Sequence, residues 1–366
     1  MVVRNCFSSR VMICAGDSSG CARRSLSTYF ATAGPCSRLP LSSSLMSARS
    51  IAPPLMASPF LSSATDFSPI SILVVCPPVA TLVIVTRSST VVGISDGARQ
   101  RPAPLLQPYV RWYEGYRLTG FPPGQHLGLS SPDLTVVLSL DQPVDITRAA
   151  APGQQPGRFT ALASGLATSA VTIAHDGNQH GIQLALTPAG ARALLGVPTS
   201  ALGAWVVELE DLLGPDAQEL LERIAATPEW RQRFAILDRV LTRRLFDARD
   251  AVQMDARVAH AWQQLVARPG TAVRAVADDL GWSRRYLTSR FTAELGITPK
   301  ESARIARFDR SKAMLRRPEA LLSDVAVRCG FYDQAHLARE WREFAGVPPS
   351  RWRQDEVFPF VQDSGA

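Results

Sequence analysis

The chain has 366 residues, of which 46% are hydrophobic and 19% are charged, and this length accommodates about two domains that each bury a core. The net charge of +7 and the isoelectric point near 9.4 favour an acidic partner, either nucleic acid or an anionic membrane surface. Five of the six cysteines precede residue 97, and the sixth, Cys329, lies in an apolar helical pattern typical of a small buried side chain. A disulfide framework would spread cysteines through the folded region, so we expect a reducing compartment.

Residues 1–97 differ from the rest of the chain in composition. They contain three acidic residues and no lysine, and they show no sustained helical or strand period. Their Arg- and Ser-rich composition also fits an organellar transit peptide, and Arg23-Arg24 could open a twin-arginine signal, although no long apolar run follows. The apolar segment 70–85 is short for a membrane span and is interrupted by Pro77-Pro78. We expect a disordered tail, or translated sequence upstream of the true start, and no membrane segment.

A β-rich module is expected over residues 98–200. The aromatic segment 108–116 indicates a strand or short helix, and the run 135–140 indicates a strand. The segments 170–174 and 182–186 flank the turn Asp176-Gly177-Asn178, a pattern that predicts a β-hairpin.

Helical patterns follow the strands. Thr187 and Pro188 fit the N-cap and first position of a helix that runs to about Leu195. The region 206–245 has helical spacing throughout, with start signals at Gly214-Pro215-Asp216 and Thr227-Pro228-Glu229. We therefore expect a helical connector over residues 201–257.

The C-terminal region contains an internal repeat. From the leucine of each copy, the aromatic residue, the glycine and the proline follow after four, nine and twelve residues, and the second copy has one extra residue in its turn. The copies are Val276-Ala277, Gly281-Trp282, Leu287, Phe291, Gly296, Pro299 and Val325-Ala326, Gly330-Phe331, Leu337, Trp341, Gly346, Pro349.

Each copy predicts a helix-turn-helix unit. The Val-Ala pair marks the inward face of a first helix, and the glycine after it suits a tight turn with positive φ. The second helix buries the leucine and the aromatic residue and ends at the second glycine. Flanking helices complete the core, one through Val258, Trp262, Leu265 and Val266, the other through Ile305, Phe308 and Leu315, with Asp309 facing solvent or an arginine.

The exposed positions of the second helices are the candidate DNA-binding residues. Arginine, glutamine and short hydroxyl side chains bind phosphates and the edges of bases. Residues 271–353 carry sixteen Lys/Arg and ten Asp/Glu, a net charge of +6. The candidates are Ser283, Arg284, Arg285, Thr288 and Ser289 in the first unit, and Gln334, Ala335, His336 and Arg339 in the second.

Residues 258–353 resemble the DNA-binding domain of the AraC/XylS family of bacterial regulators. The stretch beginning Val276-Ala277 is similar to the first helix-turn-helix of that family, and Ser323–Arg353, with its Gly-Phe-x-Asp-Gln turn, to the second. The resemblance implies a double helix-turn-helix that reads successive major grooves of promoter DNA. It also implies base reading by Arg285 and Ser289, with Arg284 and Thr288 beside them, and by the four candidates of the second unit, Ala335 offering only an apolar contact. Trp341 replaces the usual Phe, and Ser311 replaces the usual Ala.

Residues 104–245 and the C-terminal segment Phe358–Asp363, in the tail 354–366, are similar to a subgroup of these regulators. This similarity implies a sensor or dimerisation role for the β-rich module, with an effector of unknown identity. The fold class expected is α+β, a β-rich sensor-like module followed by an all-α domain. The partners expected are double-stranded promoter DNA, a small-molecule effector, RNA polymerase and a second copy of the chain. The family is bacterial, and the location expected is the cytoplasm, at the nucleoid.

Two other functions compete with this interpretation. The first alternative is a small-molecule or metal-binding β-barrel, which is suggested by His126, His175 and His180. These histidines lack a ligand spacing such as His-x-His with a following Glu. The helical domain would then bind protein instead of DNA. The region expected to fold, after residue 97, contains no glycine-rich phosphate-binding loop, no Gly-x-Ser-x-Gly motif of a serine nucleophile and no pattern typical of a cysteine nucleophile. We therefore expect neither catalysis nor a cofactor.

Overall fold

The computed structural model describes residues 72–76, 79–85, 91–247, 253–268, 270–317 and 319–355, with side chains from residue 93 onward. Most of the segment 1–97 and the C-terminal residues 356–366, including Phe358–Asp363, lie outside the described residues. The expectations for those two segments therefore stay predictions.

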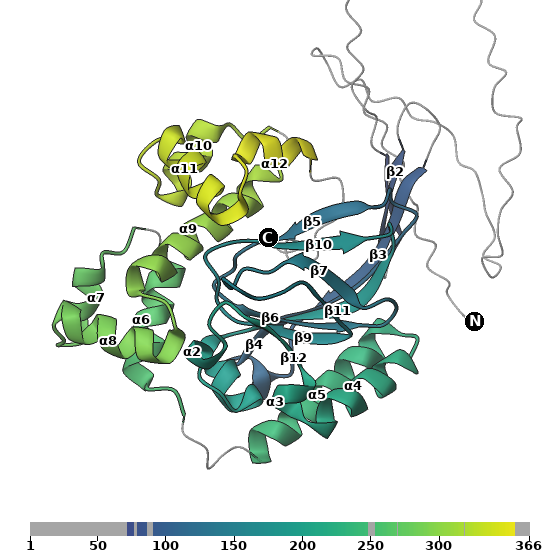
Figure 1. Ribbon diagram of the computed structural model, residues 1–366, viewed down its shortest axis with the longest axis horizontal. Helices are drawn as coiled ribbons and strands as arrows, with labels where there is room; N and C mark the ends of the chain where they lie inside the picture. The colour runs from purple at the N-terminus through teal and green to yellow at the C-terminus, as the bar shows by residue number, and fades with distance from the viewer. Residues whose placement is uncertain are drawn as a thin grey trace, which may run out of the picture. The chain divides into compact units, whose positions relative to one another are not determined.

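The β-rich module is built from two antiparallel sheets (Figure 1). The larger sheet has the strand order β1-β2-β3-β4-β11-β6-β9-β12, and the smaller has the order β5-β10-β7-β8. The strands are β1 (Ile72–Cys76), β2 (Val79–Val85), β3 (Val91–Gln100), β4 (Val110–Thr119), β5 (Gly124–Gly128), β6 (Leu134–Ser139), β7 (Val144–Arg148), β8 (Gly157–Phe159), β9 (Ala161–Ser164), β10 (Val171–His175), β11 (Gln179–Leu186) and β12 (Val206–Glu208). A β-rich module followed by a helical domain confirms the predicted α+β class.

The expected hairpin over 170–186 is wrong. Strand β10 pairs with β5 and β7 in the smaller sheet, whereas β11 pairs with β4 and β6 in the larger one. The turn between them is a corner where the chain changes sheets. The corner is tight at Gly177, which adopts a φ of +100°. A side chain at this position would collide with the backbone of Phe121, so the corner requires glycine.

Both expected boundaries of the module also need correction. Strand β3 begins at Val91 and pairs with β4 from Ile94 to Gln100, so the module extends before residue 98. Strand β12 pairs with β9, so residues 206–208, expected to be helical, form the last strand of the larger sheet. The helical spacing of this short segment does not determine its structure. Hydrogen bonds to β9, a distant part of the chain, stabilise the extended conformation instead.

Helices cover the outer face of the larger sheet (Figure 1). They include η2 (Pro104–Leu106), α1 (Pro188–Gly190), the π-helical turn η3 (Ala191–Leu195), α2 (Thr199–Leu202), α3 (Glu210–Leu213), α4 (Pro215–Ala225) and α5 (Trp230–Asp247). The Thr187 side chain accepts a hydrogen bond from Gly190 N–H, which confirms the predicted N-cap. The Tyr113 hydroxyl donates to Asp238 of α5, and Trp230 lies so close to Gly115 that a Cβ there would collide with the indole ring. The connector is therefore part of the sheet's covering.

The helical domain comprises α6 (Ala256–Ala267), α7 (Val273–Asp279), α8 (Arg284–Leu295), α9 (Pro299–Leu315), α10 (Leu322–Cys329), α11 (Gln334–Ala345) and α12 (Pro349–Asp355). As predicted, α6 buries Val258, Trp262 and Leu265, and α9 buries Ile305, Phe308 and Leu315. Val266, predicted with them, is half-buried at the edge of the same core. Cys329 is also buried. The Asp309 side chain is 38% exposed, in line with the expected contact with solvent, and its charged partner is Lys312 at 2.9 Å instead of an arginine.

The two departures from the AraC/XylS pattern contact each other. The Trp341 indole donates to the Ser311 hydroxyl at 2.8 Å, and both side chains are fully buried. The same hydroxyl donates to the Phe308 carbonyl at 2.7 Å. A larger aromatic ring with a polar N–H is accommodated because the serine supplies the acceptor that an alanine would lack.

Candidate functional site

The turns of the two repeated units have matching geometry. Gly281 and Gly330 adopt φ of +66° and +79°, as the repeat predicted for its first glycine. In each turn the residue after the glycine donates its backbone N–H to the alanine of the Val-Ala pair, Trp282 to Ala277 and Phe331 to Ala326, both at 2.8 Å. The two units are therefore copies of one helix-turn-helix in structure as well as in sequence.

Each second helix, α8 or α11, is fixed by a polar cap and an apolar inner face. Ser283 caps α8 by accepting a hydrogen bond from Tyr286 N–H, and Asp333 caps α11 by accepting one from His336 N–H. The leucine and aromatic residue at i and i+4 of each helix are 0% exposed. Burial of one face orients the opposite face outward. We call α8 and α11 the reading helices.

The candidates of the first unit gather on the outward face of α8. Arg284, Arg285 and Ser289 are exposed, whereas Thr288 is half-buried and its hydroxyl donates to the Arg284 carbonyl. The hydroxyl of Ser283, an exposed residue, already accepts the capping hydrogen bond.

In the second unit, Gln334, Ala335 and Arg339 are exposed on α11. His336 is more constrained, since its Nδ1 accepts from Tyr332 N–H at 3.1 Å and its Nε2 lies 3.4 Å from Glu340. The ring also packs edge-on against Phe331. His336 thus stiffens the longer second turn.

Two exposed aromatic residues beside the reading helices were missed by the sequence reasoning. Tyr332, the extra residue of the second turn, is 91% exposed, and Tyr286, in the first turn of α8, is 48% exposed. An exposed phenol hydroxyl can donate to a phosphate oxygen. The insertion of one residue in the second turn was the available signal for Tyr332.

The three candidate arginines of the reading helices differ in their ion pairs from the arginines of α9 and from Arg290 of α8, which pairs with Asp255 at 3.6 Å. Arg304 and Arg307 on α9 both bind Glu340, at 2.9 and 3.1 Å, and Arg304 also binds Glu343. Arg284, Arg285 and Arg339 form no ion pair with any residue that the structure describes. Their charges are consequently available to an external anion.

The C-terminal half of α8 contacts the β-rich module. Arg192 of η3 makes two hydrogen bonds to Glu294, at 2.5 and 2.8 Å, a bidentate arginine–carboxylate pair. Ser200 donates to the Ala293 carbonyl at 2.7 Å. The module therefore contacts one end of this reading helix.

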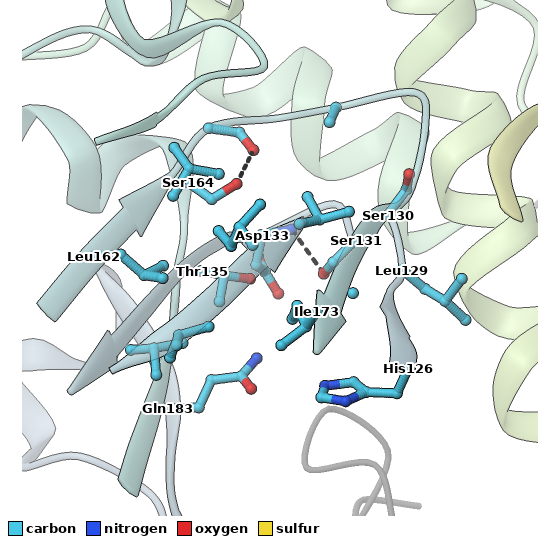
Figure 2. A pocket seen from close by; sticks show the side chains of 18 of the residues that line it. His126, Leu129, Ser130, Ser131, Asp133, Thr135, Leu162, Ser164, Ile173 and Gln183 are labelled. Atoms are coloured by element: carbon cyan, nitrogen blue, oxygen red, sulfur yellow. Dashed lines mark hydrogen bonds between the residues drawn. The ribbon is translucent and has the colours of Figure 1, made fainter. Parts of the chain in front are cut away.

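A cavity of about 110 Å³ lies inside the β-rich module, and both sheets line it (Figure 2). Its wall includes Val144, Ile146 and Ile173 from the smaller sheet and Thr135, Leu162 and Gln183 from the larger sheet. In Figure 2 the polar ends of Gln183 and His126 are directed at the space between them. The polar residue Gln183 within the apolar run 182–186 was the sequence signal for this cavity.

Burial controls the charges at the cavity. It raises the pKa of Asp133 to about 6, although a hydrogen bond from Arg111 at 2.6 Å favours the ionised form. Burial and the neighbouring His175 lower the pKa of His126 to about 3, so this imidazole is neutral at neutral pH.

The three histidines of the β-rich module do not converge. The rings of His126 and His175 lie 5.4 Å apart, but His180 contacts Arg233 at 2.9 Å and the edge of Trp230. Burial, with Arg117 and Arg233, lowers the pKa of His180 to about 4. Within the described ranges no group of three or more His, Cys, Asp or Glu side chains has the arrangement of a metal site. The same ranges contain no helix with the length and hydropathy of a membrane span.

Comparison with known proteins identifies the C-terminal region. Residues 276–355 match the family described as "Helix-turn-helix domain". The transcriptional activator RhaS of Escherichia coli is 34% identical over 80 residues, which are 22% of this chain and 29% of RhaS. The chain thus spans less than a third of the length of the curated relatives it matches.

Solved structures show more distant likenesses. ToxT of Vibrio cholerae is 10% identical, covers 69% of this chain and 98% of its own, and has a TM-score of 0.42. The C-terminal domain of AraT, a response regulator of Geobacillus stearothermophilus, is 22% identical over 31% of this chain and 95% of its own, with a TM-score of 0.27. The chain therefore carries a C-terminal helix-turn-helix domain that is similar to part of the transcriptional activator RhaS.

Proposed function

We propose that the chain is a sequence-specific regulator of transcription that binds promoter DNA through α8 and α11, with Arg284, Arg285, Ser289, Gln334 and Arg339 facing the DNA. Ser283, Thr288, Ala335 and His336 complete the contact surface. The β-rich module modulates this binding in response to a small molecule. RNA polymerase and a second copy of the chain are the further partners in this proposal, and bacterial cytoplasm at the nucleoid is the location. No catalytic activity is assigned.

The observation that carries the proposal is the pair of equivalent units, each presenting exposed arginine without an internal ion pair. On the joining helix α9, by contrast, Arg304 and Arg307 both bind Glu340. Exposed guanidinium groups on two similarly built helices suit the phosphates and guanine edges of adjacent major grooves.

Two contacts support modulation by the β-rich module. The Arg192–Glu294 pair and the Ser200–Ala293 hydrogen bond tie the module to α8, while the capped N-terminal end of α8 carries the exposed arginines. A change in the module can therefore alter the placement of this reading helix.

Selection of binding sites from random duplexes with the full chain, followed by titration of the selected site at several salt concentrations, tests the proposal. We expect one enriched consensus and an affinity that falls steeply with salt, by about 10³-fold or more between 50 and 200 mM if about six phosphates are contacted. The control is a duplex of the same composition with the consensus scrambled.

The competing protein-binding function makes the opposite prediction. It would yield no enriched consensus, or equal affinity for the selected and scrambled duplexes at every salt concentration. Either result would rule out sequence-specific DNA binding.

A further inference from the structure

The cavity of the β-rich module is lined by both aliphatic and polar side chains. Val144, Ile146 and Ile173 contribute aliphatic surface, and Leu162 faces them from the larger sheet. Gln183, Tyr116 and Thr135 place polar groups along the same cavity. A cavity lined in this way suits a molecule with one hydrogen-bonding end and an aliphatic remainder.

Gln183 and Tyr116 have unused hydrogen-bonding capacity at the cavity. Gln183 is only 6% exposed, yet its side-chain amide makes no hydrogen bond to any protein group in the described ranges. The Tyr116 hydroxyl, on a side chain 9% exposed, likewise has no such partner. Buried amides and hydroxyls are almost always paired, so an amide directed into a cavity indicates an occupant that donates and accepts hydrogen bonds.

The cavity offers little charge to an occupant. None of its lining residues is Lys or Arg. Its one carboxylate, Asp133, is already engaged by Arg111 at 2.6 Å, and the pKa of this group is raised by its own burial. A carboxylate or phosphate ligand would lose its hydration without gaining a cation, and an amine would have to compete with Arg111.

We propose that this cavity binds an uncharged small molecule with an amide, hydroxyl or carbonyl end and a short aliphatic or cyclic remainder. Its polar end bonds Gln183, with Tyr116 and Thr135 beside it, and its apolar part contacts the valine and isoleucine side chains. The volume of about 110 Å³ fits a small ligand, since a dry protein cavity of about 150 Å³ binds benzene. The chemical class of the ligand follows from the cavity alone, whereas the ligand's role as an effector of DNA binding rests on the proposed function.

The loop at the cavity rim provides a route to the DNA-binding domain. Ser130 and Asp133 both line the cavity, and the Ser130 carbonyl accepts a hydrogen bond at 3.0 Å from Lys312 of α9, the helix that joins the two units. Lys312 is 1% exposed and also pairs with Asp309. Arg111, which holds Asp133, stacks over Trp262 of α6. An occupant that shifts this loop therefore acts directly on α9 and α6.

Three probes on one carbon skeleton test the ligand class. Binding of hexanamide, hexanoate and hexylamine to the full chain is measured by titration calorimetry at pH 7.5, where only hexanamide is uncharged. We expect hexanamide to bind with a dissociation constant below about 1 mM and at least about tenfold more tightly than either charged probe. Equal or tighter binding of a charged probe, or no binding of any of the three, overturns the proposal.

Variants place the binding in this cavity. Gln183→Leu keeps the approximate shape of the side chain, removes the buried amide and should weaken hexanamide binding about tenfold or more. Tyr116→Phe removes only the hydroxyl and should weaken it less. Gln218→Leu, on the exposed face of α4, is the matched control and should bind as the wild type does. Undiminished binding by Gln183→Leu would contradict the site.

The coupling is tested on the two lysines of α9. Saturating hexanamide should change the affinity for a selected DNA site at least about threefold in the wild type and in Lys300→Met, whose lysine is exposed. In Lys312→Met we expect hexanamide to bind with wild-type affinity but to leave the DNA affinity unchanged. A hexanamide-dependent change in DNA affinity that persists in this variant would contradict the route through Lys312. The calorimetric binding uses no DNA, so its failure is distinct from a failure of the DNA-binding proposal.

Discussion

Replacing Arg285 and Arg339 together by alanine should reduce the affinity for a selected DNA site by about 10²–10⁴-fold. Both side chains are exposed on the reading helices and form no ion pair within the described part of the chain. Each arginine should contribute about 1–3 kcal/mol through base or phosphate contacts, and the two contributions should add because they lie in different units. Titration of a fluorescent duplex at fixed salt measures the loss.

The matched control is Arg231→Ala on α5, an exposed arginine of the β-rich module's helical cover. It removes the same charge and should change the affinity much less than either reading-helix variant. Single variants should also relax base discrimination at different positions of the site. Wild-type affinity in the double variant would show that α8 and α11 do not face the DNA.

Trp341→Ala should lower the free energy of unfolding by about 3–5 kcal/mol and eliminate DNA binding by the second unit. The indole is fully buried and packs against Phe308 and Trp352, with ring centroids 4.8 and 5.0 Å away. Removing it leaves a large void and an unoccupied acceptor at Ser311. Denaturant unfolding monitored by circular dichroism measures the change. A loss below about 1 kcal/mol would mean that the second unit does not depend on this core.

The hydrogen bond itself is isolated by a double-mutant cycle. Ser311→Ala alone leaves the buried indole N–H without an acceptor and should lower the free energy of unfolding by about 1–3 kcal/mol. The same substitution in a Trp341→Phe background should cost much less, because phenylalanine has no N–H to satisfy. Equal costs in both backgrounds would show that the two departures from the family pattern are independent.

The helical domain was predictable because its signals are local. The interval between Leu287 and Phe291, and between Leu337 and Trp341, fixes which face of each helix is buried. Glycine at the turns specifies a conformation that few other residues adopt. The family resemblance added the names of the reading positions. It did not indicate that His336 is held by the Tyr332 backbone and lies close to Glu340.

The β-rich module was less predictable because strand pairing depends on distant residues. The segments around Asp176-Gly177-Asn178 have the local pattern of a hairpin, and only their partners β5, β7, β4 and β6 reveal that they join different sheets. The cavity arises from that separation of the sheets.

Two residues indicated the cavity and its link to α9, but local sequence patterns could not assign their roles. Gln183 interrupts an apolar strand, and Lys312 falls on the same helical face as Phe308 and Leu315. A polar residue at an inward position signals a special environment, but the Ser130 carbonyl that receives Lys312 lies 182 residues away in sequence. Such a partner cannot be read from spacing.

Hydroxyl-radical footprinting of the full chain on its selected site, with the stoichiometry measured in parallel, tests most directly whether both units of one chain read DNA. We predict that one chain protects two segments about 10 base pairs apart on one face of the duplex, because two reading helices in adjacent major grooves are separated by about one helical turn. Arg285→Ala should weaken protection of one segment and Arg339→Ala of the other. Protection of a single segment per chain, insensitive to one of these substitutions, would contradict the account.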